Sequence, residues 1–142
     1  MQVFIIGTPL ETAMALDRKR LNKQIIECRQ ILDALYGYSK PWSNHPCVLQ
    51  YREHKQWLYE YTQCLEQYAM GMVNTPRVYS EIADRYRPSF HTQEYFDQMK
   101  RRLYSKDNEH YKQWAYLGES EQNYYFVDGE WRKYINGKRI EL

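Results

Sequence analysis

The sequence predicts a mainly α fold: a compact single-domain helical bundle with a small C-terminal β-meander. Three observations predict it. The chain has 142 residues, enough for one domain with its own core. Apolar residues recur at helical spacing, behind clear cap residues, as far as about residue 117. Beyond Gly118, two hairpin dipeptides separate short aromatic runs. We therefore expect a helical domain at 1–117 and a β-hairpin appendage at 118–142, packed on or beside it.

The first two helices are predicted by their caps. Thr8–Pro9–Leu10–Glu11 is a capping box with Pro at the first helical position, so a short helix begins there. Asp17 can cap a second, longer helix that continues to about Leu35 and stops at Gly37.

One side of the second helix is apolar, and the flank of that side is charged. The core-facing stripe has 4-3-4-3 spacing and consists of Leu21, Ile25, Cys28, Leu32 and Leu35. At about 100° per residue, Arg20, Lys23 and Glu27 fall together beside this stripe. That flank should border solvent or a cleft.

Two middle helices follow. Ser43 or Asn44 caps the first of them, with Pro46 in its first turn. This helix should be long and largely buried, because its apolar positions are Trp57, Leu58, Tyr61, Cys64, Leu65, Tyr68 and Met72. Asn74–Thr75–Pro76 starts another helix, which ends before Pro88.

Thr92 begins the next helix, which turns the basic run Lys100–Arg102 mostly outward. Its inward positions are Phe96, Met99 and Leu103. Asp107 caps a final short helix through Trp114.

After these helices the pattern becomes that of a three-stranded meander. The strands are Tyr124–Val127, Glu130–Ile135 and Lys138–Ile140. The connections are Asp128–Gly129 and Asn136–Gly137, dipeptides preferred in two-residue hairpin turns because both positions need positive φ.

The positive charge of the chain is local. The net charge is only +2, so a nucleic-acid surface has to come from clusters. Residues 18–30 hold five cations and one acid, a net +4, and residues 100–112 hold five cations and two acids, a net +3. Aromatic residues make up 16% of the chain, 15 of them Tyr, and such rings fill cores and also stack on unpaired bases.

Several chemistries lack their sequence signals. The three cysteines have no CxxC spacing, and we expect Cys28 and Cys64 to be buried thiols. The chain has no HExxH motif, glycine-rich phosphate loop, GxSxG elbow or paired carboxylates on a helix face. The apolar run Val3–Ile6 is too short for a signal peptide or membrane span. We therefore expect a cytoplasmic monomer with no cofactor, metal or membrane partner; as an enzyme it would use one acid and a nitrogen or hydroxyl nucleophile.

Three segments give a family resemblance. They are Leu16–Asp17–Arg18–Lys19–Arg20–Leu21–x–Lys23–Gln24–x–x–Glu27, then Trp42–Ser43–Asn44–His45–Pro46, then Arg102–Leu103–x–x–Lys106 followed by Tyr111 and Trp114. In order and spacing they resemble the pyrimidine-dimer DNA glycosylases of the endonuclease V type, in a small phage and bacterial branch. The resemblance covers roughly residues 10–114.

The resemblance implies an activity and a set of site residues. The family is all-helical, flips a nucleotide at a pyrimidine dimer in duplex DNA, and attacks C1′ of the sugar with its N-terminal amine. Glu27 matches the family's catalytic glutamate. A residue as long as Gln2 should block removal of Met1, so the amine is that of Met1, and we assign both residues to the catalytic site. The resemblance implies DNA contacts at Arg20, His45, Arg102 and Lys106, and it places the family's aromatic segment near Tyr111 and Trp114. From the two basic clusters we add Arg18, Lys23 and Arg101 as DNA contacts. The implied function is a DNA-repair N-glycosylase, with or without an AP-lyase step, acting on a damaged or modified pyrimidine, most readily a pyrimidine dimer.

Plainer interpretations stay open. Glu27 could simply pair with Lys23 four residues earlier. His45 could bond within its own loop, the basic residues of 100–112 could form a solvated face, and Tyr111 and Trp114 could belong to the core or its rim. An alternative function is a non-catalytic DNA-binding module, favoured by Gln2 and by Ile26, which stands where the well-known enzyme of this type has arginine. An RNA-binding or structural phage protein is a third option.

Overall fold

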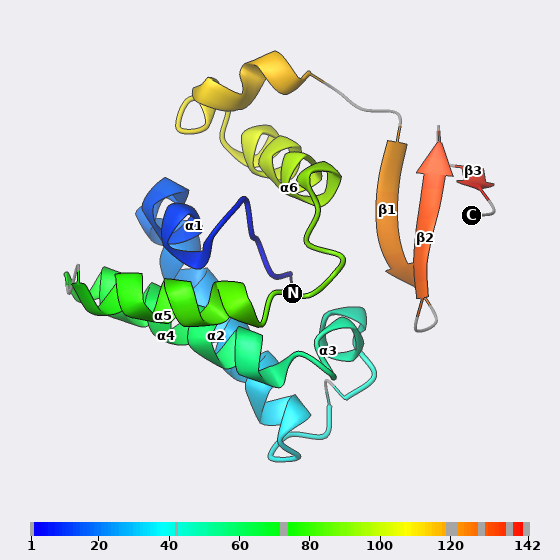
Figure 1. Ribbon diagram of the computed structural model, residues 1–142. Coiled ribbons are helices and arrows are strands. Elements are labelled where there is room, and N and C mark those ends of the chain that lie inside the picture. The colour runs from blue at the N-terminus through cyan, green and yellow to red at the C-terminus, as the bar shows by residue number, and fades with distance from the viewer. Residues whose placement is uncertain are drawn as a thin grey trace.

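The computed structural model describes residues 2–41, 43–71, 74–118, 122–127, 130–135 and 138–140. Helices fill the chain up to Leu117, and strands follow (Figure 1). The helices are α1 (Pro9–Ala15), α2 (Arg18–Leu35), α3 (Pro46–Gln50), α4 (Lys55–Ala69), α5 (Asn74–Arg85), α6 (Gln93–Lys106) and the 3₁₀ helix η1 (Lys112–Leu117). The strands are β1 (Gln122–Val127), β2 (Glu130–Ile135) and β3 (Lys138–Ile140).

Helix α4 is the centre of the helical body and packs against α1, α2 and α5. Its inner face carries Trp57, Leu58 and Tyr61, all at most 1% exposed. Trp57 stacks on Tyr61 with ring centroids 4.9 Å apart, and it also stacks on Tyr51 with centroids 5.5 Å apart. Large buried rings of this kind supply much of the apolar area that stabilises a domain of this size.

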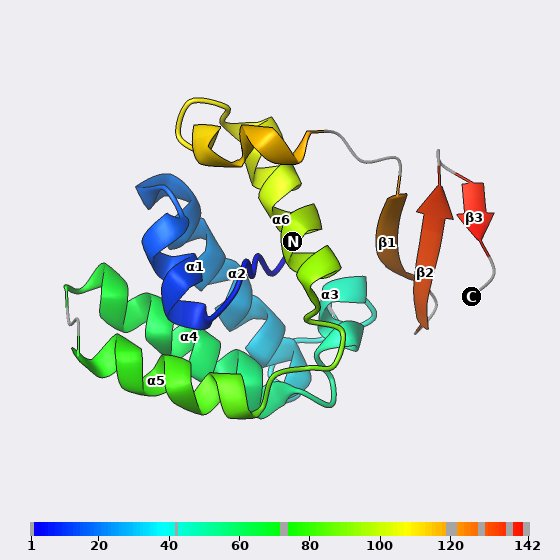
Figure 2. The ribbon, with the colours of Figure 1, turned by 45° about the horizontal axis from the view of Figure 1, so that its top comes forward.

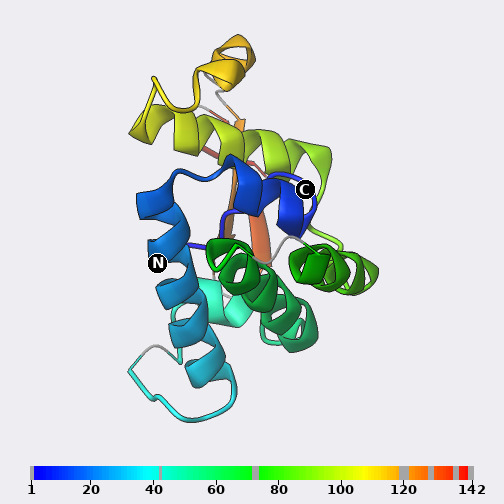
Figure 3. The same ribbon diagram turned by 90° about the vertical axis from the view of Figure 1, so that its left-hand side faces the viewer.

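The first residues of the chain pass through the interior instead of lying on the surface. Val3 and Ile5 are fully buried, and Phe4 is 8% exposed. The segment 2–6 runs between α2 and α6 (Figure 2). In Figure 3, α6 lies above this segment, and α4 and α5 lie below it. Residues 3–5 therefore lie inside the helical body, next to α2.

The caps predicted for the first two helices are present. Thr8 accepts a hydrogen bond from the Glu11 N–H, and the Glu11 carboxylate accepts one from the Thr8 N–H, both at 3.1 Å. Asp17 caps α2, which ends at Leu35, and Gly37 follows with φ +81°. The buried stripe of α2 differs from the prediction, however: Ile31 and Gln24 are buried, whereas Leu32 and Leu35 are only half-buried.

The single long helix expected after residue 44 is wrong. The chain forms α3, then a turn at 51–54, then α4. The N-cap of α3 is His45, not Ser43 or Asn44. The His45 Nδ1 accepts a hydrogen bond from the Cys47 N–H at 3.1 Å. The turn brings Tyr51 into the core, where its hydroxyl meets His91 Nε2 at 2.9 Å. This tertiary contact favours the turn at 51–54 over one continuous helix from α3 into α4.

The expectation that Asp107 caps a short helix through Trp114 is also wrong. Asp107 closes the end of α6, and its side chain accepts a hydrogen bond from the His110 N–H at 3.0 Å. The helix that follows is the 3₁₀ helix η1, and it begins at Lys112 without a side-chain cap.

The fold class needs a correction in its β part. The backbone pairs β1 with β2 and β2 with β3, both antiparallel, and β1 lies beside α3. Among the residues whose burial is described, however, none beyond Leu117 takes part in the hydrophobic core. The hydrophobic core that the structure describes lies within residues 3–117, and a β-meander is not supported as part of this compact fold. The hairpin dipeptides are local signals, which carry no information on packing against helices. The predicted turns 128–129 and 136–137 lie outside the described residues, as do Met1, Trp42 and Met72.

Candidate active-site cleft and nucleic-acid surface

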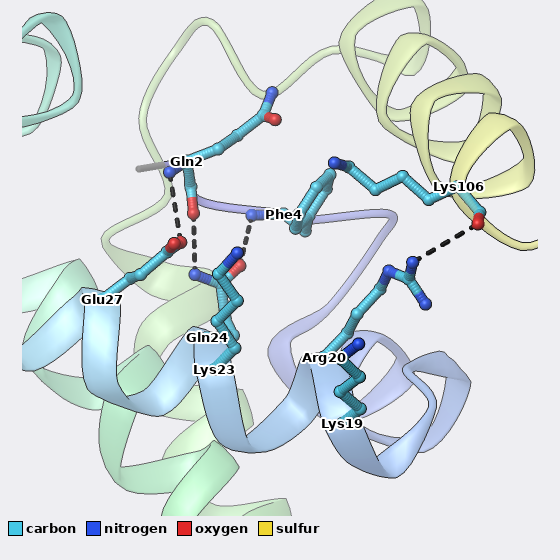
Figure 4. Close-up of a pocket in the computed structure, with 8 residues that line it drawn as sticks. All are labelled: Gln2, Phe4, Lys19, Arg20, Lys23, Gln24, Glu27 and Lys106. Carbon is cyan, nitrogen blue, oxygen red and sulfur yellow. Dashed lines mark hydrogen bonds between the residues drawn. The ribbon is translucent and has the colours of Figure 1, made fainter.

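A cleft of about 270 Å³ lies between α2, the N-terminal segment and the end of α6 (Figure 4). Its lining residues are Gln2, Phe4, Lys19, Arg20, Lys23, Gln24, Glu27 and Lys106. Arg20, Lys23 and Glu27 thus share one cleft, as their spacing on α2 predicted. The volume is slightly below the range of about 300–1,000 Å³ that is typical of small-molecule pockets.

Side chains hold the N-terminal segment at one edge of this cleft. Gln24 is 2% exposed, and its Nε2 donates to the Gln2 carbonyl at 2.8 Å while its Oε1 accepts from the Phe4 N–H at 2.7 Å. Tyr61 donates its hydroxyl proton to the Phe4 carbonyl. Tyr95 donates to the Val3 carbonyl at 3.5 Å. Side chains therefore satisfy the Gln2, Val3 and Phe4 carbonyls and the Phe4 N–H, as burial requires.

Glu27 faces the start of the described chain. Its Oε2 accepts a hydrogen bond from the backbone N–H of Gln2 at 3.3 Å. Glu27 is half-buried, so its carboxylate is open to the cleft. Its contact with Gln2 shows that it is more than a surface partner of Lys23. The predicted catalytic residue Met1 lies outside the described residues.

Three lysines add positive charge around the carboxylate. Lys19, Lys23 and Lys106 line the cleft and are exposed, and Lys19, Lys23 and Glu27 follow one another at intervals of four along α2. Figure 4 shows Lys106 reaching toward the cleft from α6, opposite the lysines of α2. Exposed ammonium groups around a concave surface form an electrostatic footprint for phosphates.

Arg20 joins the two walls of the cleft. Its guanidinium contacts Asp17 at 3.2 Å and Asp107 at 3.9 Å, and it donates to the Lys106 carbonyl at 3.4 Å. Burial raises the pKa of Asp17, but hydrogen bonds from Tyr111 and Arg20 outweigh burial and leave that pKa below its usual value. Arg20 therefore has a structural role whether or not it also contacts DNA, which stays a prediction.

A second, wider groove adjoins the first along α6. It has a volume of about 940 Å³ and shares Gln2 and Lys106 with the cleft. Its remaining lining residues are Gln98, Arg101, Arg102, Tyr104, Ser105, Asn108, Ala115 and Gly118. The predicted DNA contacts Arg101 and Arg102 are thus beside the cleft but outside it. Arg18 is exposed at the start of α2, and neither pocket includes it.

His45 is half-buried at the start of α3 and does not line the cleft. Burial lowers the pKa of its imidazole, and the negative charge of Glu27 opposes that shift. His45 is therefore close enough to sense Glu27, and its Nδ1 is committed to the Cys47 N–H. A contact with DNA stays a prediction for this residue.

The assignment of Tyr111 and Trp114 to DNA binding needs correction. Tyr111 is fully buried and Trp114 is 7% exposed, and their rings stack at 5.3 Å. The Tyr111 hydroxyl donates to the Asp17 carboxylate and accepts from the Asp17 N–H, the latter at 3.1 Å. Both rings belong to the core between α2 and η1, so neither face is available to a base.

Sequence reasoning missed three cleft residues. Lys19 could have been found, because it is four residues before Lys23 on the same flank. Gln24 also left a signal: it is a polar side chain one position before Ile25 in the apolar stripe, where burial demands hydrogen-bond partners. Phe4 left none, because its position depends on the path of the N-terminal segment.

Neither a metal cluster nor a membrane span is found within the described residues. No group of three or more His, Cys, Asp or Glu side chains in that part of the chain is placed to hold a metal ion. None of its helices combines the length and the apolar character needed to cross a membrane.

Comparison with known proteins gave one match. Residues 1–70 match the sequence model of the family described as pyrimidine dimer DNA glycosylase. The match includes α1, α2, α3 and α4 and therefore the acid and most of the cations of the cleft. No curated protein and no solved structure matched the chain.

Proposed function

We propose that this protein is a DNA-repair N-glycosylase that also cleaves the strand at the abasic sugar. The N-terminal half of the chain belongs to the pyrimidine dimer DNA glycosylase family. The family indicates a DNA glycosylase with DNA as its substrate. The finer proposal is that the N-terminal amine attacks the sugar of a damaged or modified pyrimidine, most readily a pyrimidine dimer, with Glu27 as the partner acid. The observation that carries it is the 3.3 Å contact between the Gln2 backbone nitrogen and the Glu27 carboxylate inside a cationic cleft.

Covalent geometry supports an amine at this position. The α-amine of Met1 is three bonds from the Gln2 nitrogen, so it lies within about 4 Å of that atom in any conformation. An α-amine has an ordinary pKa of about 7.7–8, so a useful fraction is uncharged and nucleophilic at neutral pH. A lysine would need burial to reach the same state.

The proposed reaction balances with these groups alone. The amine attacks C1′, the glycosidic bond breaks with its electron pair on the base, and the base takes up a proton. Loss of the amine proton and opening of the sugar give a Schiff base, and removal of a C2′ proton then expels the 3′ phosphate. Glu27 would stabilise the cationic sugar and transfer protons, a role worth about 10²–10⁴-fold in rate.

The lysines support the choice of substrate. Lys19, Lys23 and Lys106 surround the cleft, where they could hold the phosphates on either side of one extruded sugar. Extrusion of a nucleotide costs a few kcal/mol and is cheapest at a distorted lesion, so damaged duplex is favoured. We place this activity in the cytoplasm of a bacterial or phage-infected cell and expect a monomer.

Borohydride reduction tests the proposal. It should trap the Schiff base as a covalent adduct between the intact protein and duplex DNA that carries an abasic site, and peptide mass analysis should locate the adduct at the N-terminal residue. Ultraviolet-irradiated plasmid should be nicked under the same conditions. Adduct formation at a lysine, or none at all, would contradict the proposed nucleophile.

A non-catalytic DNA-binding module is the second candidate, and two observations favour it. The described partner of Glu27 is a peptide N–H, which cannot act as a nucleophile. Ile26 is 56% exposed beside Glu27, which puts an apolar side chain on the DNA-facing flank. Tight binding to irradiated plasmid without nicking would select the module.

A further inference from the structure

The amide of Gln24 occupies the place that a neighbouring strand would take. Residues 2–5 form no helix or turn, and the Gln2 carbonyl and the Phe4 N–H, which flank Val3, both face Gln24. Gln24 Nε2 donates to that carbonyl at 2.8 Å, and Gln24 Oε1 accepts from that N–H at 2.7 Å. One side chain thus supplies the donor and the acceptor that an adjacent parallel strand would offer.

Gln24 and Glu27 are three residues apart on α2, and side chains with that spacing are neighbours on a helix surface. Holding the Gln2 carbonyl at Gln24 therefore fixes how far the segment extends along α2. With the segment in that register, the Gln2 N–H is 3.3 Å from the Glu27 carboxylate. A slip by one residue would present the other side of the segment to both groups.

We propose that Gln24 is a positioning residue, whose side-chain amide sets the register of the N-terminal segment and so aims the terminal amine at the sugar beside Glu27. The inference rests on the proposed function, since it concerns the same nucleophile. It assigns to Gln24 a role in the rate of Schiff-base formation beyond its role in the core.

Two variants separate positioning from packing. Gln24→Met keeps the size of the side chain and removes both hydrogen bonds to the segment. Gln24→Glu keeps an acceptor for the Phe4 N–H but, when ionised, loses the donor to the Gln2 carbonyl, so it tests the register if Gln24→Met does not fold. Tyr61→Phe is the matched control, because it removes the hydroxyl that donates to the Phe4 carbonyl and leaves Gln2 held.

The readout is the single-turnover rate of borohydride trapping on saturating abasic-site duplex, measured from pH 6 to pH 9 by the full chain. We expect both Gln24 variants to slow trapping by about 10–100-fold, as misplaced reactants do, with DNA affinity within about twofold of the wild type. Tyr61→Phe should lower thermal stability and leave the trapping rate nearly unchanged.

Two results would overturn the inference, and they differ from each other. If folded Gln24→Met or Gln24→Glu traps DNA as fast as Tyr61→Phe does, Gln24 is only a core residue and the proposed nucleophile stands. If the wild type forms no N-terminal adduct, the proposed nucleophile fails and the positioning role fails with it.

Discussion

The two basic helices of this protein carry similar charge but differ in what surrounds that charge. The cations of α2 line a small cleft with Glu27 and the N-terminal segment. The arginines of α6 line a groove more than three times as large, and none of the described residues around that groove is acidic. Positive charge can hold a polyanion at both places, whereas the proposed chemistry also needs a fixed acid, and of these two pockets only the α2 cleft is lined by one.

Removing the carboxylate of Glu27 should have the largest effect, because it removes the main difference between the cleft and the groove. Glu27→Gln keeps the shape of the side chain and its contact with Gln2, but cannot stabilise a cationic sugar or accept a proton. We expect a loss of about 10²–10⁴-fold in the single-turnover rate on abasic-site duplex, with DNA affinity unchanged or slightly higher. Gel-based cleavage and fluorescence anisotropy measure the two quantities.

The control for this variant is Glu109→Gln, which removes a carboxylate that is 90% exposed on the turn after α6. Its cleavage rate should match that of the wild type. Equal activity of Glu27→Gln and Glu109→Gln would mean that the cleft is a binding surface like the groove of α6.

Low pH should destabilise the protein, because His91 must stay neutral in the core. The two surfaces can therefore be compared only in the pH range in which the protein stays folded. Burial, followed by the charges of Arg87 and His54, lowers the pKa of His91 to about 3. An unfolded chain binds the proton near pH 6.5, so His91 costs no stability above that pH, and stability is lost as the pH falls from about 6.5 toward 3. We expect the free energy of unfolding to be about 3 kcal/mol lower at pH 4 than at pH 7 through this residue.

Urea denaturation at pH 7 and pH 4 measures this effect. In His91→Gln the pH-dependent part should shrink by about 3 kcal/mol, while the exposed His110→Gln should behave as the wild type does. An unchanged pH dependence in His91→Gln would assign acid unfolding to other groups.

Removing cations in pairs should have the smallest of these effects, and it should sharpen the comparison between the cleft and the groove. Lys19→Ala with Lys23→Ala, and Arg101→Ala with Arg102→Ala, should each reduce the slope of log affinity against log salt by about 0.9 for every phosphate that the variant no longer neutralises. Only the lysine pair should also slow cleavage on saturating DNA, because only these side chains line the cleft with Glu27.

Lys112→Ala is the control for both pairs, since that side chain is 77% exposed on the surface and lines neither pocket. Its salt slope should be unchanged. An equal loss of cleavage rate in the lysine and arginine pairs would show that the two surfaces act as one.

The sequence predicted what depends on neighbours along the chain. The caps at Thr8 and Asp17 are local, and so is the spacing that gathers Arg20, Lys23 and Glu27 on one flank of α2. These features follow from helical geometry alone, which fixes the relative position of residues three, four and seven apart.

Long-range contacts decided the rest. The turn before α4 is tied to His91, which is 40 residues from Tyr51 in the sequence. Tyr111 is buried through Asp17, 94 residues away, so its aromatic character alone could not separate a core ring from a base-stacking one. The packing of the β part could not be predicted for a related reason, because Asp-Gly and Asn-Gly specify a local turn and not the surface on which a sheet packs.

The interior path of residues 2–6 also decides how the protein must be produced. An affinity tag fused ahead of Met1 would turn the terminal amine, the proposed nucleophile, into an unreactive amide. Material made in that form could bind oligonucleotides well and still be scored as inert. A purification handle attached after the last strand, or a leader removed without leaving extra residues, avoids that misleading assay.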